Sequence, residues 1–329
     1  MLLKKERILS GMRPTGSLHL GHYVGALVNW VGLQDKYECF YMIADWHALM
    51  SEYANPSIIP NSTRDMVADW LAVGLDPGKS AIFRQSDVRE HAELHMILSA
   101  ITPISWLERC PTYKEQLREL AGKEVNNYAF LGYPVLQAAD ITLYKTSVVP
   151  VGEDQVPHVE LTREIVRRFN YLYKKEVLIE PKAFLTKSAR LPGLDGRKMS
   201  KSYGNSIEIG TEAEEIRKKV MTMLTDVKRA RLKDQGHPDE CNLYPYYEAL
   251  FPSLTASIRK ECVNSSRGCT ECKCQLAEEI IKFTEPMRKI RNEVLSTPGK
   301  IDSVLSEGAD RARNLAIQTM KEVRGAMGF

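Results

Sequence analysis

Apolar residues form two alternating patterns through the first two thirds of the chain. Short continuous runs predict buried strands at residues 7–11, 40–44, 81–83 and 148–151. Between these runs, apolar residues at helical spacing predict helices from Leu20 onward, over 63–73 and over 157–169. Strands that alternate with helices in this way are typical of a parallel sheet with helices on both faces. The predicted fold class is therefore α/β.

The pattern changes after about Asn205. Helical periodicity dominates there, strand-like runs fade, and five of the seven cysteines occur in this part. We therefore predict two domains, an α/β domain over residues 1–206 and a helical domain over residues 207–329. The last segment, 301–327, is predicted to form amphipathic helices whose role is packing.

Composition narrows the class of protein. Of the 329 residues, 43% are hydrophobic, so the chain can bury a sizeable core. A formal net charge of +3 does not indicate a nucleic-acid partner, so any polyanion site has to be a local patch. No apolar run is long enough for a signal peptide or a membrane span. We expect a cytoplasmic protein without a membrane partner, whose cysteines are thiols, metal ligands or catalytic groups.

A loop over residues 11–17, rich in Gly, Pro, Thr and Ser, joins the first predicted strand to the first helix. Its glycines let a ligand approach the backbone, and the N-terminus of the helix attracts phosphates through unpaired N–H groups and the helix dipole. His19 and His22 fall on the first helical turn, about where the phosphates of ATP would lie. The alternative is a capping loop with two surface histidines, since short Gly-rich motifs often occur by chance.

A second segment, Lys198-Met199-Ser200-Lys201-Ser202, follows a Gly- and Asp-containing stretch that suits a mobile loop. Both lysines can contact a triphosphate as flexible point charges, and such contacts stabilise a departing pyrophosphate. A solvated basic loop is the commoner explanation for a lysine pair of this kind. Together and in this order, however, the two segments match the signature motifs of class I aminoacyl-tRNA synthetases.

Nearly the whole chain resembles the bacterial tryptophanyl-tRNA synthetases. The resemblance is carried by residues 10–16 (SGMRPTG), 133–140 (YPVLQAAD), 149–155 (VPVGEDQ) and 198–202 (KMSKS). It implies a Rossmann-type parallel-sheet catalytic domain followed by an α-helical anticodon-binding domain, acting as a homodimer. It also implies that L-tryptophan reacts with ATP and Mg²⁺ to give tryptophanyl-adenylate, and that the amino acid then passes to the 3′-terminal ribose of tRNA(Trp).

The same resemblance implies the site residues. For ATP they are Arg13, Pro14, Thr15, Gly21, His22, Gly152, Glu153, Asp154, Leu191, Lys198, Met199, Ser200, Lys201 and Ser202. The implied catalytic groups are His19, His22, Lys198 and Lys201. The implied tryptophan-binding residues are Asp140, Tyr133, Gln155 and His47, with Asp140 accepting the indole N–H. Many bacterial members have Gln in place of Arg13 and Thr-Ile-Gly-Asn in place of residues 19–22, so this chain is closer to the general class pattern.

Tyrosine is the main alternative substrate, because the tyrosyl enzymes are near relatives and both amino acids are large aromatics with one polar edge. A buried carboxylate suits an indole N–H, which can only donate. A site that hydrogen-bonds its substrate also rejects an analogue without that group, so no editing domain is needed. Asp140 fits the tryptophan pattern, although without the resemblance an N-cap would be the better interpretation of this residue.

A third possibility is a synthetase-like regulator that binds RNA without catalysing aminoacylation. A non-catalytic relative is free to lose the basic groups of both motifs. Here His19, His22, Lys198 and Lys201 are all present, which favours an enzyme.

The cysteines after residue 240 predict a metal site. Cys241, Cys262, Cys269 and Cys272 have the spacing Cys-x20-Cys-x6-Cys-x2-Cys, and Cys274 follows closely. Four thiolates suit either zinc or a 4Fe–4S iron–sulfur cluster, and unliganded thiols are the alternative. Some bacterial tryptophanyl-tRNA synthetases carry a 4Fe–4S cluster here, which favours iron–sulfur. The upstream spacing is slightly shorter than in those proteins, so Cys274 is a further candidate ligand.

A basic run precedes these cysteines and consists of Lys228, Arg229, Arg231 and Lys233. Basic side chains bind phosphates, and aromatic side chains stack on unpaired bases, for which the nearby candidates are Tyr244, Tyr246 and Tyr247. The alternative for the run is a solvated helix face. Given the resemblance, contact with tRNA is an equally good interpretation.

Overall fold

A computed structural model of the protein describes residues 5–111, 127–185 and 190–329. Within these residues, five strands form one sheet in the order β3-β2-β1-β4-β5, and every neighbouring pair is parallel. The strands are β1 (Arg7–Met12), β2 (Glu38–Ile43), β3 (Ser80–Arg84), β4 (Val148–Val151) and β5 (Lys182–Leu185). This confirms the predicted α/β class and its Rossmann-type parallel sheet. The four predicted strands are β1 to β4, whereas β5 was missed.

Strand β1 lies in the middle of the sheet, with β2 and β3 on one side and β4 and β5 on the other. On one side it pairs with β2 along its whole length, from Arg7 opposite Glu38 to Met12 opposite Ile43. On the other side it pairs with β4, with Ile8 opposite Val148. The strand order therefore reverses between β1 and β4. In open parallel sheets, ligands bind outside the carboxyl ends of the strands at such a reversal.

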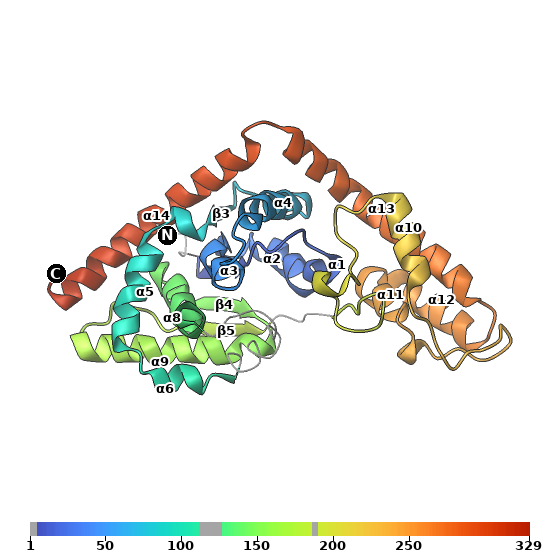
Figure 1. The fold of residues 1–329 in the computed structure, drawn as a ribbon, viewed down its shortest axis with the longest axis horizontal. Helices are drawn as coiled ribbons and strands as arrows, with labels where there is room; N and C mark the ends of the chain where they lie inside the picture. The colour runs from blue at the N-terminus through green and yellow to red at the C-terminus, as the bar shows by residue number, and fades with distance from the viewer. Residues whose placement is uncertain (1–4, 112–126, 186–189) are drawn as a thin grey trace.

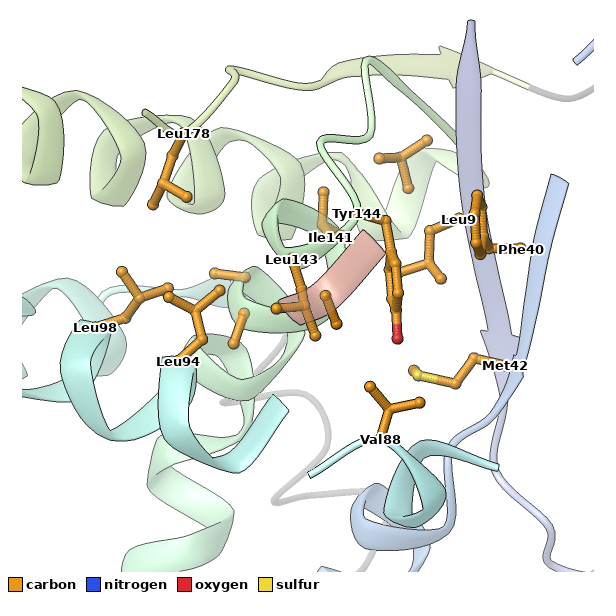
Figure 2. Packing of buried hydrophobic residues seen from close by; sticks show 14 of the residues in the cluster. Leu9, Phe40, Met42, Val88, Leu94, Leu98, Ile141, Leu143, Tyr144 and Leu178 are labelled. Atoms are coloured by element: carbon orange, nitrogen blue, oxygen red, sulfur yellow. The ribbon is translucent and has the colours of Figure 1, made fainter. Parts of the chain in front are cut away.

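Both faces of the sheet are buried. Successive residues of β2 enter different clusters, Phe40 and Met42 on one face, Cys39 and Tyr41 on the other. Figure 2 shows the first cluster, where Leu9, Phe40 and Met42 of the sheet lie across from Leu143, Tyr144 and Leu94. Burial on both faces explains why these strands are nearly continuous apolar runs.

The helices of the sheet region lie on both of its faces (Figure 1). The predicted helix at Leu20 consists of α1 (Leu20–His22), a π-helical turn over Tyr23–Leu27, and α2 (Val28–Leu33). The others are α3 (Asp45–Glu52), α4 (Ile58–Ala72), α5 (Glu90–Ile101), α6 (Ile104–Glu108), α8 (Tyr128–Leu143) and α9 (Val156–Tyr173). Helices α4 and α9 confirm the helices predicted at 63–73 and 157–169.

The chain after the sheet is helical, as predicted. It contains α10 (Ala213–Thr222), α11 (Tyr244–Leu250), α12 (Pro252–Val263), α13 (Cys269–Ser296) and α14 (Lys300–Met327). Helices α10 to α13 share a hydrophobic cluster that includes Ile216, Tyr247, Ile258 and Ile280. In the described part of the chain, no helix has both the length and the apolar composition that crossing a membrane requires.

Two long helices connect the helical region to the sheet. Helix α13 leads from the helical region to the apex in Figure 1, and α14 returns from there across β3 and α5. The chain reverses at Gly299, whose φ of +72° suits glycine. Ala309, Ala312 and Met320 of α14 belong to the same cluster as the sheet residues. The helix therefore has the packing role predicted for residues 301–327, with the α/β part as its partner.

Gly308 lets α14 lie directly on β3. A Cβ atom there would be 1.9 Å from the backbone oxygen of Ile82, a distance that real atoms do not adopt. We expect Gly308→Ala to lower the free energy of unfolding by about 1–3 kcal/mol, because the helix has to move off the strand. Urea denaturation measures this change.

Gly325 is the matched control, since it is on the same helix and a Cβ there meets nothing within 4 Å. Gly325→Ala should leave stability unchanged or raise it by up to about 1 kcal/mol through helix propensity. Equal effects of the two substitutions would contradict this account of α14.

Candidate active site

A cavity of about 350 Å³ opens at the carboxyl ends of β1 and β4, where the strand order reverses. This volume lies at the lower end of the range for small-molecule sites. The strands contribute residues 9–13 and 149–152 to its walls. Helices α3, α8 and α9 contribute the polar side chains His47, Tyr133, Gln137, Asp140 and His158. The cavity thus combines an apolar wall with a few converging polar groups.

Asp140 lies inside α8 and is only 2% exposed, so the N-cap interpretation of this residue is wrong. Its Oδ2 atom is 2.8 Å from Nε2 of His47. Its Oδ1 atom accepts a hydrogen bond of 2.8 Å from Gln85 and lies 2.7 Å from Nδ1 of His91. Burial by itself raises the pKa of a carboxyl group, but His91 and His47 outweigh it and hold the pKa of Asp140 well below its usual value.

These contacts keep Asp140 ionised and therefore limited to accepting hydrogen bonds. A carboxylate has room for about four donors. His47 and Gln85 fill two of these positions and His91 lies beside a third, so the carboxylate can accept one more donor from the cavity. Sequence analysis missed Gln85 and His91, which support this carboxylate. Gln85 comes directly after β3, and His91 is in the first turn of α5. Nothing in the local pattern indicates that their side chains turn toward α8.

Two other predicted substrate residues are joined through His158, which sequence analysis also missed. Its Nε2 atom is 2.8 Å from the Tyr133 hydroxyl, and its Nδ1 atom is 2.9 Å from Oε1 of Gln155. Burial lowers the pKa of His158 to about 4, so the ring is neutral at pH 7 and has one donor and one acceptor. The amide nitrogen of Gln155 donates to Asp154, so its oxygen faces His158. Nδ1 therefore donates, and Nε2 accepts from Tyr133.

The direction of these hydrogen bonds determines whether Tyr133 acts as a donor or an acceptor toward the cavity. Tyr133 donates its only hydroxyl hydrogen to His158, so its oxygen acts toward the cavity as an acceptor. An acceptor at this position suits a cationic ammonium group.

His19 and His22 are packed against each other beside the glycine-rich loop. Their ring centroids are 3.7 Å apart, and each ring accepts a hydrogen bond of 3.3 Å from the backbone N–H of the other residue. His19 is buried and caps α1, so a capping role is present but the surface position of the alternative interpretation is wrong. Burial, with Lys201 adding to it, lowers the pKa of His19 to about 4. Burial, with His19 and Lys201 adding to it, lowers the pKa of His22 to about 3.

The second motif folds back onto the first. A Cβ at Gly16, where φ is +117°, would lie 2.9 Å from Nζ of Lys201. A Cβ at Gly21 would lie 2.9 Å from the His19 ring and 3.4 Å from the sulfur of Met199. The backbone joins the two segments as well, since Leu20 N–H donates to Ile207 and Ile209 N–H donates to Leu18, both at 2.9 Å. Lys201 is therefore held against the first loop and is not a solvated surface lysine.

The other residues that the resemblance implies for ATP lie outside the contact between the two motifs. Arg13 and Gly152 line the cavity, and Glu153 and Asp154 form the turn just after β4. Thr15 N–H donates to the backbone of Arg13, across Pro14. Leu191 is buried in the same hydrophobic cluster as Met199 of the second motif. The Ser202 side chain lies outside the described residues.

Asn205 braces the second motif and was not identified from sequence. Its Oδ1 atom accepts from Ser200 N–H at 2.8 Å, and its Nδ2 group donates to the Lys198 carbonyl and to Asp195. A Cβ at Gly193 would lie 2.2 Å from this amide, so the glycine is needed for its position. The loop that carries Lys198 is thus held by its own neighbours.

Residues 3–285 match the family model described as class I tRNA synthetases for W and Y. The chain belongs to this family.

Relatives within this family are similar over nearly their whole length. The chain is 50% identical to the tryptophan–tRNA ligase of Thermotoga maritima, over 98% of the chain and 99% of that protein. It is 41% identical to the tryptophan–tRNA ligase of Ralstonia nicotianae, over 98% of each protein. A crystal structure of the tryptophanyl-tRNA synthetase of Campylobacter jejuni, complexed with ADP and tryptophan, superposes with a TM-score of 0.88 at 34% identity, covering 98% of this chain and 100% of that one.

The cysteines of this synthetase come together at one end of the helical region. Cys269 and Cys272 are on the first turn of α13, Cys262 is near the end of α12, and Cys241 follows a short turn before α11. No two of the seven cysteines form a disulfide. Burial raises the pKa of Cys241 and Cys262, and raises that of Cys272 to about 11. The thiols are also close enough to oppose one another's ionisation. Cys274 is exposed.

The predicted metal site is not formed in the structure. Among residues 5–111, 127–185 and 190–329, no three His, Cys, Asp or Glu side chains are arranged to hold a metal ion. The metal ligands therefore remain a prediction.

The three tyrosines expected to stack on bases are core residues instead. Tyr244 is 6% exposed, and Tyr246 and Tyr247 are fully buried. Two of the hydroxyls bond to backbone carbonyls: Tyr246 donates to Pro192 at 2.6 Å, and Tyr247 donates to Cys272 at 2.9 Å. The prediction of base stacking by these residues is wrong, because all three rings are buried in the hydrophobic cluster of the helical region.

The histidine pair generates a pH prediction. Because the pKa values of His19 and His22 are about 4 and 3, neither ring should titrate between about pH 5.5 and 8. The unfolded chain takes up these protons near pH 6.5 while the folded chain does not, so both residues lower stability as pH falls below that value. NMR of ¹³Cε1-labelled histidine, assigned through His19→Asn and His22→Asn, measures the midpoints. A midpoint near 6.5 for either ring would contradict the burial argument.

Proposed function

We propose that this chain is a tryptophan–tRNA ligase. It converts L-tryptophan and MgATP to tryptophanyl-adenylate and pyrophosphate, and then transfers the amino acid to the 3′-terminal ribose of tRNA(Trp). Identity of 41–50% to tryptophan–tRNA ligases over nearly full length supports the proposal. Within the structure, the observation that carries it is the buried, ionised carboxylate of Asp140 on the wall of a mainly apolar cavity.

Asp140 selects tryptophan by accepting the indole N–H. An indole has one polar group, and that group only donates, so it matches a carboxylate that only accepts. Any aromatic substrate that fails to donate leaves a buried charge with an unfilled position, which weakens its binding strongly. His47 lies on the cavity wall and holds the oxygen opposite the one held by Gln85, so it fixes the orientation of the carboxylate.

The amino end of tryptophan lies toward the other polar group of the cavity. Tyr133 is turned into an acceptor by His158, and Gln155 is held by the same histidine. Both therefore orient the substrate ammonium while its carboxylate faces the nucleotide side. Arg13 and Gly152 at the strand ends form the border between the two parts of the site.

The two motifs stabilise the triphosphate during adenylate formation. The tryptophan carboxylate attacks the α-phosphate, the bond to the bridging oxygen breaks, and pyrophosphate leaves with the electron pair. Lys198 and Lys201 supply positive charge to the departing group. Neutral His19 and His22 supply N–H donors rather than charge, because their pKa values lie far below 7.

ATP–pyrophosphate exchange with purified enzyme tests the substrate. We expect exchange with tryptophan and almost none with tyrosine. Asp140→Asn should raise KM for tryptophan about 10- to 100-fold, since one hydrogen bond to a buried charge is lost or weakened. Cys39→Ala is the control for an unrelated buried substitution. Exchange driven by tyrosine would refute the proposal, and tRNA binding without any exchange would favour a non-catalytic regulator.

We also propose that the chain acts as a homodimer, with residues 1–206 as catalytic domain and residues 207–329 as anticodon-binding domain. Arg231 and Lys233 of the basic run are largely exposed and suit contact with tRNA phosphates. Lys228 is paired with Glu240, and Arg229 with the carbonyls of Arg267 and Leu232, so these two have structural roles already.

We further propose that Cys241, Cys262, Cys269 and Cys272 hold a 4Fe–4S cluster, with zinc as the alternative. Their grouping around the start of α13 supports it, and the exposure of Cys274 argues against that residue as a ligand. Cys241 and Cys272 also pack against the hydrophobic cluster of the helical region. The cluster would tie α12, α13 and the turn before α11 together.

Iron, sulfide and zinc analysis of anaerobically purified protein measures this site. About four irons and four sulfides per chain with a broad visible absorption are expected, and Cys269→Ser should abolish both while Cys274→Ser keeps them. One zinc and no colour would replace the cluster by zinc. Protein without either metal would refute the site.

A further inference from the structure

Asp69 on α4 is a fully buried carboxylate outside the tryptophan cavity. Its Oδ2 atom accepts a hydrogen bond of 2.9 Å from the backbone N–H of Leu18. Its Oδ1 atom accepts one of 2.8 Å from Nε of Arg291. One side chain thus joins the residue before His19 to a helix more than 220 positions away in sequence.

The Leu18 contact holds the first motif in place. Both backbone groups of Leu18 are used, the N–H by Asp69 and the carbonyl by Ile209 N–H at 2.9 Å. Leu20 N–H is held by Ile207 in the same way. The backbone on either side of His19 is therefore fixed by α4 and by the segment that follows the second motif.

Arg291 supports this arrangement from α13. Besides Asp69, its guanidinium contacts Asp65, one helical turn earlier on α4, at 2.6 Å. It also lies against Gly210, where a Cβ would be 3.0 Å from Nε. In Figure 1, α13 runs beside α4 at the junction of the sheet region and the helical region. Arg291 is thus one of the side chains through which the helical region reaches the nucleotide motifs.

Charge balance gives Arg291 a second effect on the site. Burial lowers the pKa of Lys201, and the carboxylates of Asp69, Glu208 and Asp65 act against that effect. Arg291 pairs with two of these carboxylates, Asp69 and Asp65. Arg291 neutralises the same two carboxylates with a fork of donors. Without it, the acidic pair would attract Lys201 and compete with the triphosphate for that charge.

We propose that Arg291 is a positioning residue of the nucleotide site, holding the His19 loop through Asp69 and leaving Lys201 available to the triphosphate. The proposal rests on the adenylate-forming activity proposed above. Arg291 makes no contact with the tryptophan cavity, so its effect is confined to ATP. It also gives the helical region a direct means of changing the affinity for ATP.

The test compares Arg291→Met with a control on the same helix. Arg217 of α10 pairs with Glu278 of α13 and with Glu214 of its own helix, so Arg217→Met also removes an arginine that contacts α13. Calorimetric titration measures binding of a non-hydrolysable ATP analogue, and fluorescence titration measures tryptophan binding. Circular dichroism melting checks that each variant is folded.

We expect Arg291→Met to weaken binding of the analogue about tenfold, since loss of one hydrogen bond to a charged group changes affinity by about that much. Tryptophan affinity should be unchanged, and Arg217→Met should change neither. Arg291→Lys keeps a charge for Asp69 but loses the fork, so it should weaken analogue binding by less. It also serves as the test if Arg291→Met does not fold.

Unchanged analogue affinity in the folded Arg291 variants would overturn the proposal. Equal losses of analogue and tryptophan affinity would do the same, because they indicate a general structural role. Wild-type enzyme that binds the analogue but shows no exchange with tryptophan would instead refute the proposed function and leave this result intact.

Discussion

Burying a carboxylate in this fold requires donors from several distant segments, and the site depends on how that requirement is met. Asp140 is on α8, and its polar partners come from α3, from the turn after β3 and from α5. Removing any one of them leaves a charge in a low-dielectric environment without full compensation. The positions of these four elements around the sheet are therefore set by one another, and the cavity between β1 and β4 has its shape because they meet there.

The first motif is held by a second buried carboxylate, which also takes its donors from distant segments. Asp69 is buried, and its donors come from the first motif and from α13. Burial raises the pKa of Asp69 to about 6 despite these contacts, so its ionised form depends on them more than that of a surface carboxylate would. Two buried acids thus support the two parts of the proposed site, Asp140 at the cavity and Asp69 beside the first motif.

Sequence periodicity predicted the elements with a clear apolar pattern and missed those without one. Strands β1 to β4 are apolar runs between turn residues, and α4 and α9 have clear apolar faces, so their pattern was visible. Helix α8 is buried nearly all round, which removes the alternation that marks a helix, and it even contains Pro134. Strand β5 has mostly exposed side chains and lacks an apolar run. Base stacking by the tyrosines of α11 was predicted wrongly for another reason. Aromatic residues near a basic run occur both in cores and on RNA-binding surfaces, and the local sequence does not distinguish the two.

The sequence by itself determined the fold class, the family and the chemical groups available, because motifs, periodicity and residue types are local properties. Only the tertiary structure decided which groups meet. It brought Lys201 to Gly16, gave Asp140 its donors, set the polarity of Tyr133 through His158, and placed Arg291 on Asp69. These contacts join residues between 25 and 222 positions apart in sequence. Their pairing follows from the packing of whole helices against the sheet, and no short segment of the chain contains that information.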